Sequence, residues 1–247
     1  MKPYLILATA LALSATAAFA DGTFDRTLSV SGNPVVSVST GSGYIHVSPG
    51  SGSQIHVVGH VHVHSNWGGS GDEESRVKQI VANPPIEQSG NTVTIGAYHG
   101  DSDLFRNVSI DYDVTLPRTS ELQAHSGSGD LQINNIEHTV AAGTGSGSIH
   151  LTGVSSGLRA TTGSGSIEVA GNPTADWRIS TGSGSVAVTP DPSAHFNLEA
   201  TTGSGSVHAD RQIAMQGDFT HHHVAGTVNG GGPTVHITTG SGSVTIH

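Results

Sequence analysis

Alternating histidines between Ile55 and His64 are the residues in this chain whose type and spacing best suit chemistry. Residues two apart on a β-strand point to the same face, with Cα atoms about 7 Å apart. Two imidazole rings at that spacing can turn toward one Zn or Cu ion, because imidazole nitrogen is a frequent ligand of both metals. The pattern therefore predicts a candidate metal site with the ligands His60, His62 and His64.

The same pattern also fits a solvated strand face that uses histidine as its polar residue. His56 shares the parity of the three candidate ligands, so all four side chains would lie on one face. The intervening apolar residues would point to the buried face: Ile55, Val57, Val61 and Val63. Equivalent outward positions in other strands also carry histidine: His46, His150 and His208. This interpretation is favoured, so we expect no required cofactor and keep Zn or Cu binding as the alternative.

Histidine also makes the charge of the chain sensitive to mild acid. The chain has 16 His, a formal net charge of −10 with His neutral, and a pI of ≈ 5.8. Imidazole has an ordinary pKa of about 6.5, so many of these side chains would gain protons just below neutral pH. Self-association or attachment is therefore expected to strengthen as the pH falls toward the pI.

Other function classes receive little support from the residues. Carbohydrate hydrolysis needs two suitably separated carboxylic acids, whereas the repeats from Gly127 onward hold only scattered ones. The Gly-Ser-Gly-Ser-Ile units do not supply a Gly-x-Ser-x-Gly nucleophile motif. The absence of Cys excludes thiolate metal sites, and the acidic charge disfavours binding to nucleic acid. We therefore expect neither catalysis nor a nucleic-acid partner.

A repeat dominates the elements that must position these residues. Gly-Ser-Gly is followed closely by an apolar-x-apolar triplet in seven copies: 41–43, 127–129, 145–147, 163–165, 182–184, 203–205 and 240–242. The first glycines from Gly127 onward lie 18, 18, 19, 21 and 37 residues apart, and the last interval predicts a degenerate copy at 221–232. A fixed period of this length is typical of a solenoid, and alternation within each unit indicates strands. A flexible linker is the alternative, but it would not keep an apolar pair in phase with every copy.

Glycine suits the corners of such a stack. It reaches positive φ and tolerates close backbone approach, so Gly-Ser-Gly can turn the chain where neighbouring coils pack tightly. Threonine precedes most copies, and its hydroxyl is expected to stack on its equivalents in adjacent coils. These threonines are Thr40, Thr162, Thr181, Thr202 and Thr239.

Residues 21–120 are less regular than the repeats and contain the clearest helix signal. Acidic residues suit a first helical turn, and apolar residues follow at helical spacing. The pattern predicts a short helix near 72–82, ended by Pro84, within a β-rich lead-in. The regular repeats would occupy 121–247, in one domain spanning 21–247.

Residues 1–20 are predicted to form a signal peptide. Lys2 precedes an apolar run, and the small-x-small sequence ending at Ala20 fits cleavage after that residue. No later segment reaches 18 apolar residues, so we expect no membrane span after cleavage. The last strand, 243–247, has no evident cap, and its edge is expected to permit pairing with another chain.

The segment 108–117, Val-Ser-Ile-Asp-Tyr-Asp-Val-Thr-Leu-Pro, is followed by Leu122, by His125–Ile133 and by successive Thr-Gly-Ser-Gly-Ser-Ile units. This combination resembles the bacterial putative-adhesin family of exported β-repeat proteins of unknown function. The short helix and the strand at 91–95 are also similar to that family, so the resemblance covers nearly all of the chain after the leader. It implies an all-β, right-handed β-solenoid and transfers no catalytic or binding residue.

Together these observations predict an all-β, β-helix-like stack of Gly-Ser-Gly repeats of about 18–21 residues with one short helix. The predicted function is that of an exported, non-catalytic adhesin or envelope binding and assembly module. A periplasmic His-rich metal-binding protein and a purely structural scaffold are the two alternatives. The expected location is the periplasm, the cell surface or the medium of a bacterium, and the expected partner is a surface, glycan or protein ligand.

Overall fold

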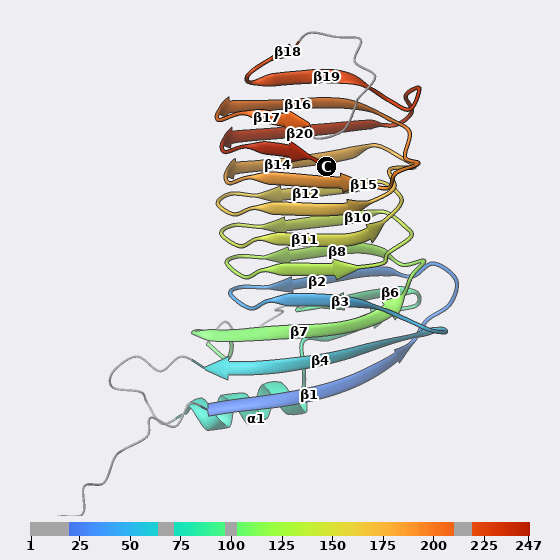
Figure 1. The fold of residues 1–247 in the computed structure, drawn as a ribbon. Helices are drawn as coiled ribbons and strands as arrows, with labels where there is room; N and C mark the ends of the chain where they lie inside the picture. The colour runs from blue at the N-terminus through green and yellow to red at the C-terminus, as the bar shows by residue number, and fades with distance from the viewer. Residues whose placement is uncertain (1–19, 64–71, 97–102, 210–218) are drawn as a thin grey trace, which may run out of the picture.

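Two large β-sheets enclose one long apolar core (Figure 1). The computed structural model describes residues 20–63, 72–96, 103–209 and 219–247. Within these ranges one helix, α1 (Glu73–Ala82), accompanies 21 strands, so the all-β class with a short helix is confirmed. The predicted signal peptide, 1–20, falls outside the described residues except for Ala20, the first residue of β1.

The two sheets are here called sheet A and sheet B. Sheet A runs in spatial order through β1 (Ala20–Ser29), β4 (Gln54–Val63), β7 (Val108–Pro117), β3 (Ile45–Gly50), β9 (Leu131–Asn134), β11 (Ile149–Val154), β13 (Ile167–Gly171), β15 (Val186–Pro190), β21 (Val244–Ile246) and β17 (Val207–Ala209). Sheet B runs through β18 (Phe219–Thr220), β19 (His223–Val228), β16 (Phe196–Ser204), β20 (Thr234–Ser241), β14 (Trp177–Ser183), β12 (Leu158–Thr162), β10 (Val140–Thr144), β8 (Glu121–Ser126), β2 (Val35–Thr40), β6 (Thr92–Ile95) and β5 (Ile86–Ser89).

A coil is one strand of sheet B, a Gly-Ser-Gly corner and the following strand of sheet A. Successive coils pair in parallel with equivalent residues aligned: Val140 of β10 aligns with Leu158 of β12, and Ile149 of β11 aligns with Ile167 of β13. The register of the second pair shifts only at the end of β11, between Thr152 and Val154. Period-two alternation sends the four aligned apolar residues inward, where all four are buried. The result is a solenoid-like stack whose side-chain rows run along its length.

At the corners, glycine carbonyls of one coil lie against glycines of the next coil with no room for a side chain between them. A Cβ added at Gly145 would lie 2.4 Å from the carbonyl oxygen of Gly127 in the preceding coil. One added at Gly147 would lie 2.1 Å from the corresponding oxygen of Gly129. Since real Cβ atoms do not approach oxygen so closely, only glycine fits these positions without a shift of the backbone.

Buried hydroxyl groups tie each corner to the one before it. Thr162 Oγ1 donates a hydrogen bond to the carbonyl oxygen of Gly147 at 2.8 Å, and Thr144 Oγ1 donates to that of Gly129 at 2.9 Å. The threonines align from coil to coil as expected, Thr144 with Thr162 and Thr162 with Thr181, but their hydroxyls bond backbone carbonyls of the neighbouring coil and not one another. Seven buried side chains occupy this row: Thr40, Ser126, Thr144, Thr162, Thr181, Thr202 and Thr239.

The C-terminal coil lies inside the stack rather than at its end. Strand β20 pairs with β14 on one side and β16 on the other, and β21 lies between β15 and β17. The prediction of a free edge at 243–247 is therefore wrong, since β21 has a neighbour on both sides. The inserted coil keeps the close contact between corner glycines, because a Cβ added at Gly240 would lie 2.6 Å from the carbonyl oxygen of Gly182.

The degenerate repeat predicted at 221–232 is also wrong. Strand β19 runs antiparallel to β16, with Val224 opposite Ala200, so this segment is not a parallel coil. The interval of 37 residues arises because the chain adds β19 before it returns to insert β20.

At the other end, β1 and β4 are antiparallel neighbours, and β4 is antiparallel to β7. Helix α1 confirms the prediction near 72–82 and buries Val77 and Ile80. Gly22 of β1 leaves room for Val77, since a Cβ added at Gly22 would lie 2.4 Å from Val77 Cγ1. No helix in the described part of the chain has the length and apolar character needed to cross a membrane.

We predict that Gly145→Ala destabilises the protein by about 1–3 kcal/mol, because the added methyl collides with the carbonyl of Gly127. Gly41→Ala is the matched control, since a Cβ at this first corner meets nothing within 4 Å. Urea unfolding of both variants measures the difference. Equal stability of the two variants would contradict the proposed tightness of the corners.

Thr162→Val should cost about 1–3 kcal/mol, since it leaves the buried carbonyl of Gly147 without its hydroxyl donor. Thr161→Val is the control, because Thr161 is the exposed neighbour on the same strand. Thermal and urea unfolding should separate the two variants. A control as unstable as Thr162→Val would assign the loss to strand propensity instead.

Candidate functional site

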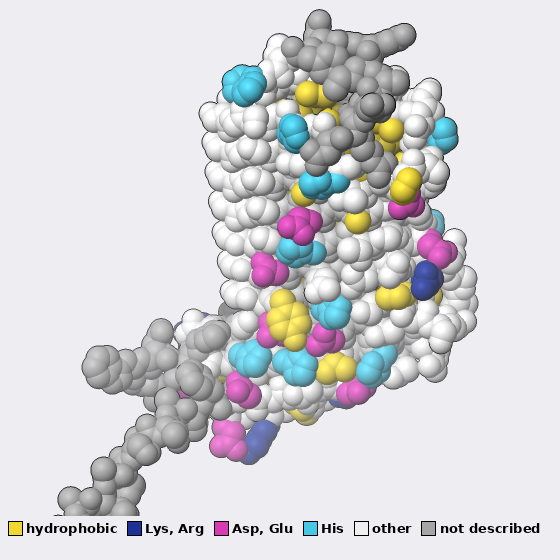
Figure 2. Space-filling model, in the orientation of Figure 1, with side chains coloured by type: hydrophobic (Ala, Val, Ile, Leu, Met, Phe, Trp, Pro, Cys, Tyr) yellow, Lys and Arg dark blue, Asp and Glu magenta, His cyan; other side chains and the backbone are white. Residues whose placement is uncertain are grey.

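The outer face of sheet A carries the alternating histidines. Burial alternates along β4: His56, Val58, His60 and His62 are partly exposed, while Ile55, Val57, Val61 and Val63 are buried. The face predicted from the sequence is therefore confirmed. Figure 2 shows histidine and acidic side chains interleaved over this part of the molecule, where Figure 1 places β1, β4, β7 and β3.

Carboxylates on the two strands beside β4 reach these imidazoles. His56 Nε2 lies 2.8 Å from Asp25 Oδ1 of β1. His62 lies between two carboxylates, with Nδ1 3.0 Å from Asp21 Oδ1 and Nε2 3.2 Å from Asp111 Oδ2. The arrangement follows from strand alternation, because β1 and β7 each present acidic residues two or four positions apart on the outer face.

Asp113 on β7 is the centre of this network. Its Oδ1 lies 3.2 Å from His46 Nδ1 on β3, and its Oδ2 lies 3.4 Å from His60 Nε2 on β4. The hydroxyl of Tyr44 also donates to Oδ2 at 3.2 Å, while the Tyr44 amide donates to Asp111 Oδ1 at 2.9 Å. Three strands and one corner are thus joined through two carboxylates.

Tyr44 is the exposed large apolar side chain of the described residues, with 40% of its surface accessible. Partial burial of the hydroxyl raises its pKa above the ordinary tyrosine value, and the negative charges of Asp113 and Asp111 raise it further. The hydrogen bond to Asp113 acts in the same direction. The phenol therefore stays protonated and serves this face as a hydrogen-bond donor.

The polar row continues along sheet A beyond the network. His46, Gln132, His150 and Glu168 follow one another on β3, β9, β11 and β13 in direct register. His150 Nδ1 lies 3.1 Å from Glu168 Oε2, which repeats the pairing of imidazole with carboxylate. A shallow hollow of ≈ 290 Å³ lies in this row, lined by polar and apolar side chains: Tyr44, Ile45, His46, Asp113, Asp130, Leu131, Gln132 and His150.

The metal site predicted at His60, His62 and His64 stays a prediction, because His64 falls outside the described residues. His60 and His62 both face outward on β4, as expected. Among the residues that the structure describes, no group of three or more His, Asp or Glu side chains is arranged to hold a metal ion. Both ring nitrogens of His62 instead face carboxylate oxygens.

The acidic partners are the site residues that the sequence interpretation missed. Asp111 and Asp113 lie about 50 residues after the histidines, and Asp21 and Asp25 lie about 35 before them, so local spacing does not connect them. The available signal was the alternation of acids in 108–117, which places Asp111 and Asp113 on one face of a strand. This face presents imidazole and carboxylate groups that can donate and accept hydrogen bonds.

The family model described as Toastrack DUF4097 matches residues 34–247, which confirms the resemblance inferred from the sequence. No curated protein matches the chain.

Two solved structures resemble the chain along most of its length. One is described as a "putative cell adhesion protein" from Clostridium sporogenes ATCC 15579, with 13% identity, a TM-score of 0.48, and coverage of 91% of this chain and 99% of the other. The second is described as a "putative adhesin" from Bacteroides fragilis NCTC 9343, with 11% identity, a TM-score of 0.32, and coverage of 92% and 97%. Identity and TM-score are low for both, so family membership rests on the sequence match.

Asp113→Asn should lower the pKa of Tyr44, because it removes a negative charge that disfavours the phenolate. Burial remains, so the pKa should move toward the ordinary value of about 10 without a complete return. Ultraviolet absorbance of the phenolate during an alkaline titration measures the change, and Tyr44→Phe identifies the transition. Asp25→Asn is the control on the same face, and an equal shift in that variant would contradict direct contact between Tyr44 and Asp113.

Proposed function

The chain belongs to the Toastrack DUF4097 family, and on that premise we propose that it is an exported, non-catalytic binding and assembly module of the bacterial envelope with an adhesin-like role. The observation that carries the proposal is the histidine and carboxylate face of sheet A. Most of its side chains project from β4, β7 and β3, each paired with a strand on both sides, and β1 is paired along its whole length with β4.

We expect the net charge of this face to depend on pH. While the imidazoles are neutral the carboxylates leave the face negative, so copies of the protein repel one another. Protonation of imidazole in mild acid balances that charge and permits close approach to another copy or to a surface. The titratable groups that meet on this face are Asp21, Asp25, Tyr44, His46, His56, His60, His62, Asp111 and Asp113.

Export supplies the setting for such a role. The leader 1–20 is removed after Ala20, and the remaining chain functions in the periplasm, at the cell surface or outside the cell. The stack is a right-handed solenoid built from Gly-Ser-Gly repeats of about 18–21 residues. The parallel register of successive coils supports this arrangement.

We predict that light scattering by the purified protein rises as the pH falls from about 7.5 to 5.5, because imidazole protonation offsets the carboxylates. A triple variant, His56→Gln, His60→Gln and His62→Gln, should lose most of this rise. EDTA is present throughout, so that metal bridging between copies is excluded. Cells that produce the triple variant should attach less well at pH 5.5 than cells that produce the unchanged protein.

The control variant removes three imidazoles from sheet B and from the turn before β19: His222→Gln, His223→Gln and His236→Gln. It should associate and attach like the unchanged protein. A flat scattering curve for the unchanged protein, or equal losses in both triple variants, would contradict a role for the sheet A face. Sensitivity of a deletion strain to zinc or copper with normal attachment would favour the metal-binding alternative.

A further inference from the structure

The outer face of sheet B carries a different chemistry from the histidine face. One register row contains Ser37, Gln123, Ala141, Arg159 and Arg178 on β2, β8, β10, β12 and β14 in turn. The two arginines are exposed and face one another directly across adjacent strands, whose spacing is about 4.8 Å. Like charges placed opposite one another in a sheet oppose folding, so this pair needs an explanation.

These arginines also differ from the other basic residues that the structure describes. Neither Arg159 nor Arg178 has a hydrogen bond or ion pair with another described residue. The remaining described cations each contact carboxylates or backbone carbonyls: Arg26, Arg76, Lys78, Arg106 and Arg118. In a chain of net charge −10, two adjacent guanidinium groups are thus left open to an external anion.

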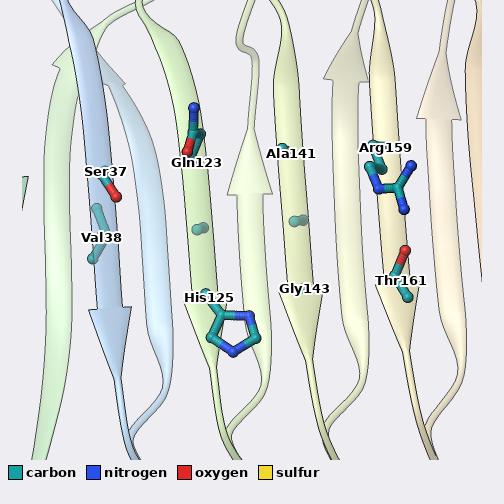
Figure 3. A pocket seen from close by; sticks show the side chains of 10 residues that line it. Ser37, Val38, Gln123, His125, Ala141, Gly143, Arg159 and Thr161 are labelled. Carbon is teal, nitrogen blue, oxygen red and sulfur yellow. The ribbon is translucent and has the colours of Figure 1, made fainter.

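A hollow of ≈ 250 Å³ lies beside Arg159. Its floor is formed by the small residues Ala141 and Gly143 of β10, between longer side chains of β8 and β12 (Figure 3). Gly143 keeps the hollow open, since a Cβ there would lie 3.1 Å from His125 Nδ1. Hydroxyl, amide, imidazole and guanidinium groups line it: Ser37, Gln123, His125, Arg159 and Thr161.

We propose that this hollow, together with Arg159 and Arg178, binds a carboxylate-bearing sugar unit of an acidic glycan. Two N–H groups of a planar guanidinium can donate parallel hydrogen bonds to the two oxygens of one carboxylate, so arginine suits a carboxylate ligand. The polar groups around the hollow suit the hydroxyls of the same sugar. The volume is slightly below the usual range of about 300–1,000 Å³ for small-molecule pockets, so one ring rather than a larger ligand occupies it.

This site gives the proposed adhesin-like role a ligand class, and it rests on that role for its biological meaning. It does not share residues with the histidine face, because the two lie on opposite sheets. The nearest carboxylate in the same row as the arginines is Glu199, which pairs with His236 at 3.2 Å and leaves the arginines unneutralised.

Calorimetric titration of the purified protein with an alginate oligosaccharide tests the site, with a neutral dextran oligosaccharide and dextran sulfate as comparison ligands. Saturable binding of the uronate and none of the neutral dextran is the expected result. The double variant Arg159→Gln and Arg178→Gln should weaken binding at least tenfold. Ala141→Gln should weaken it similarly without any change of charge, because the longer side chain fills the hollow.

The matched control is Arg106→Gln with Arg118→Gln, which removes the same charge from two ion-paired arginines elsewhere. It should bind within twofold of the unchanged protein. No saturable uronate binding, an equal loss in this control, or binding of dextran sulfate alone would overturn the proposal. The sheet A triple histidine variant should still bind the uronate. Absence of uronate binding in the unchanged protein would therefore overturn the glycan site without contradicting the acid-dependent assembly proposed for sheet A.

Discussion

The carbonyl oxygen of a corner glycine lies so close to the matching glycine of the next coil that no side chain fits between them. From the second corner onward, a buried hydroxyl from the strand before the corner bonds a glycine carbonyl of the neighbouring coil. These two contacts fix the distance between coils and their register at the same place. Strand pairing and the apolar core continue that register along both sheets.

Fixed register determines what each outer face presents. Because equivalent residues align from coil to coil, a single substitution in one repeat places its side chain directly beside those of the neighbouring coils. On sheet A this alignment joins histidines to carboxylates. On sheet B it sets two arginines side by side next to a small-residue hollow. The same scaffold thus supports two surfaces of different charge.

Much of this architecture follows from local patterns. The period of Gly-Ser-Gly predicted stacked strands, and the parity of residues 55–63 predicted which side of β4 is buried. Spatial order was not predictable, because spacing along the chain does not reveal that β20 and β21 insert between earlier coils or that β19 is antiparallel. The partners of His62 were missed for a related reason: β4 acquires Asp21 and Asp111 only through its pairing with β1 and β7.

Amide hydrogen exchange at the corners tests most directly whether they hold the stack together. The Gly145 and Gly163 amides donate to carbonyls of the preceding coil, those of Ser126 or Gly127 and of Thr144. They should exchange only with global unfolding, as slowly as the central strands, whereas the open turn glycines Gly32 and Gly90 should exchange rapidly. Corner amides that exchange as fast as those turns would contradict the account, because the register of both faces would then lack its support.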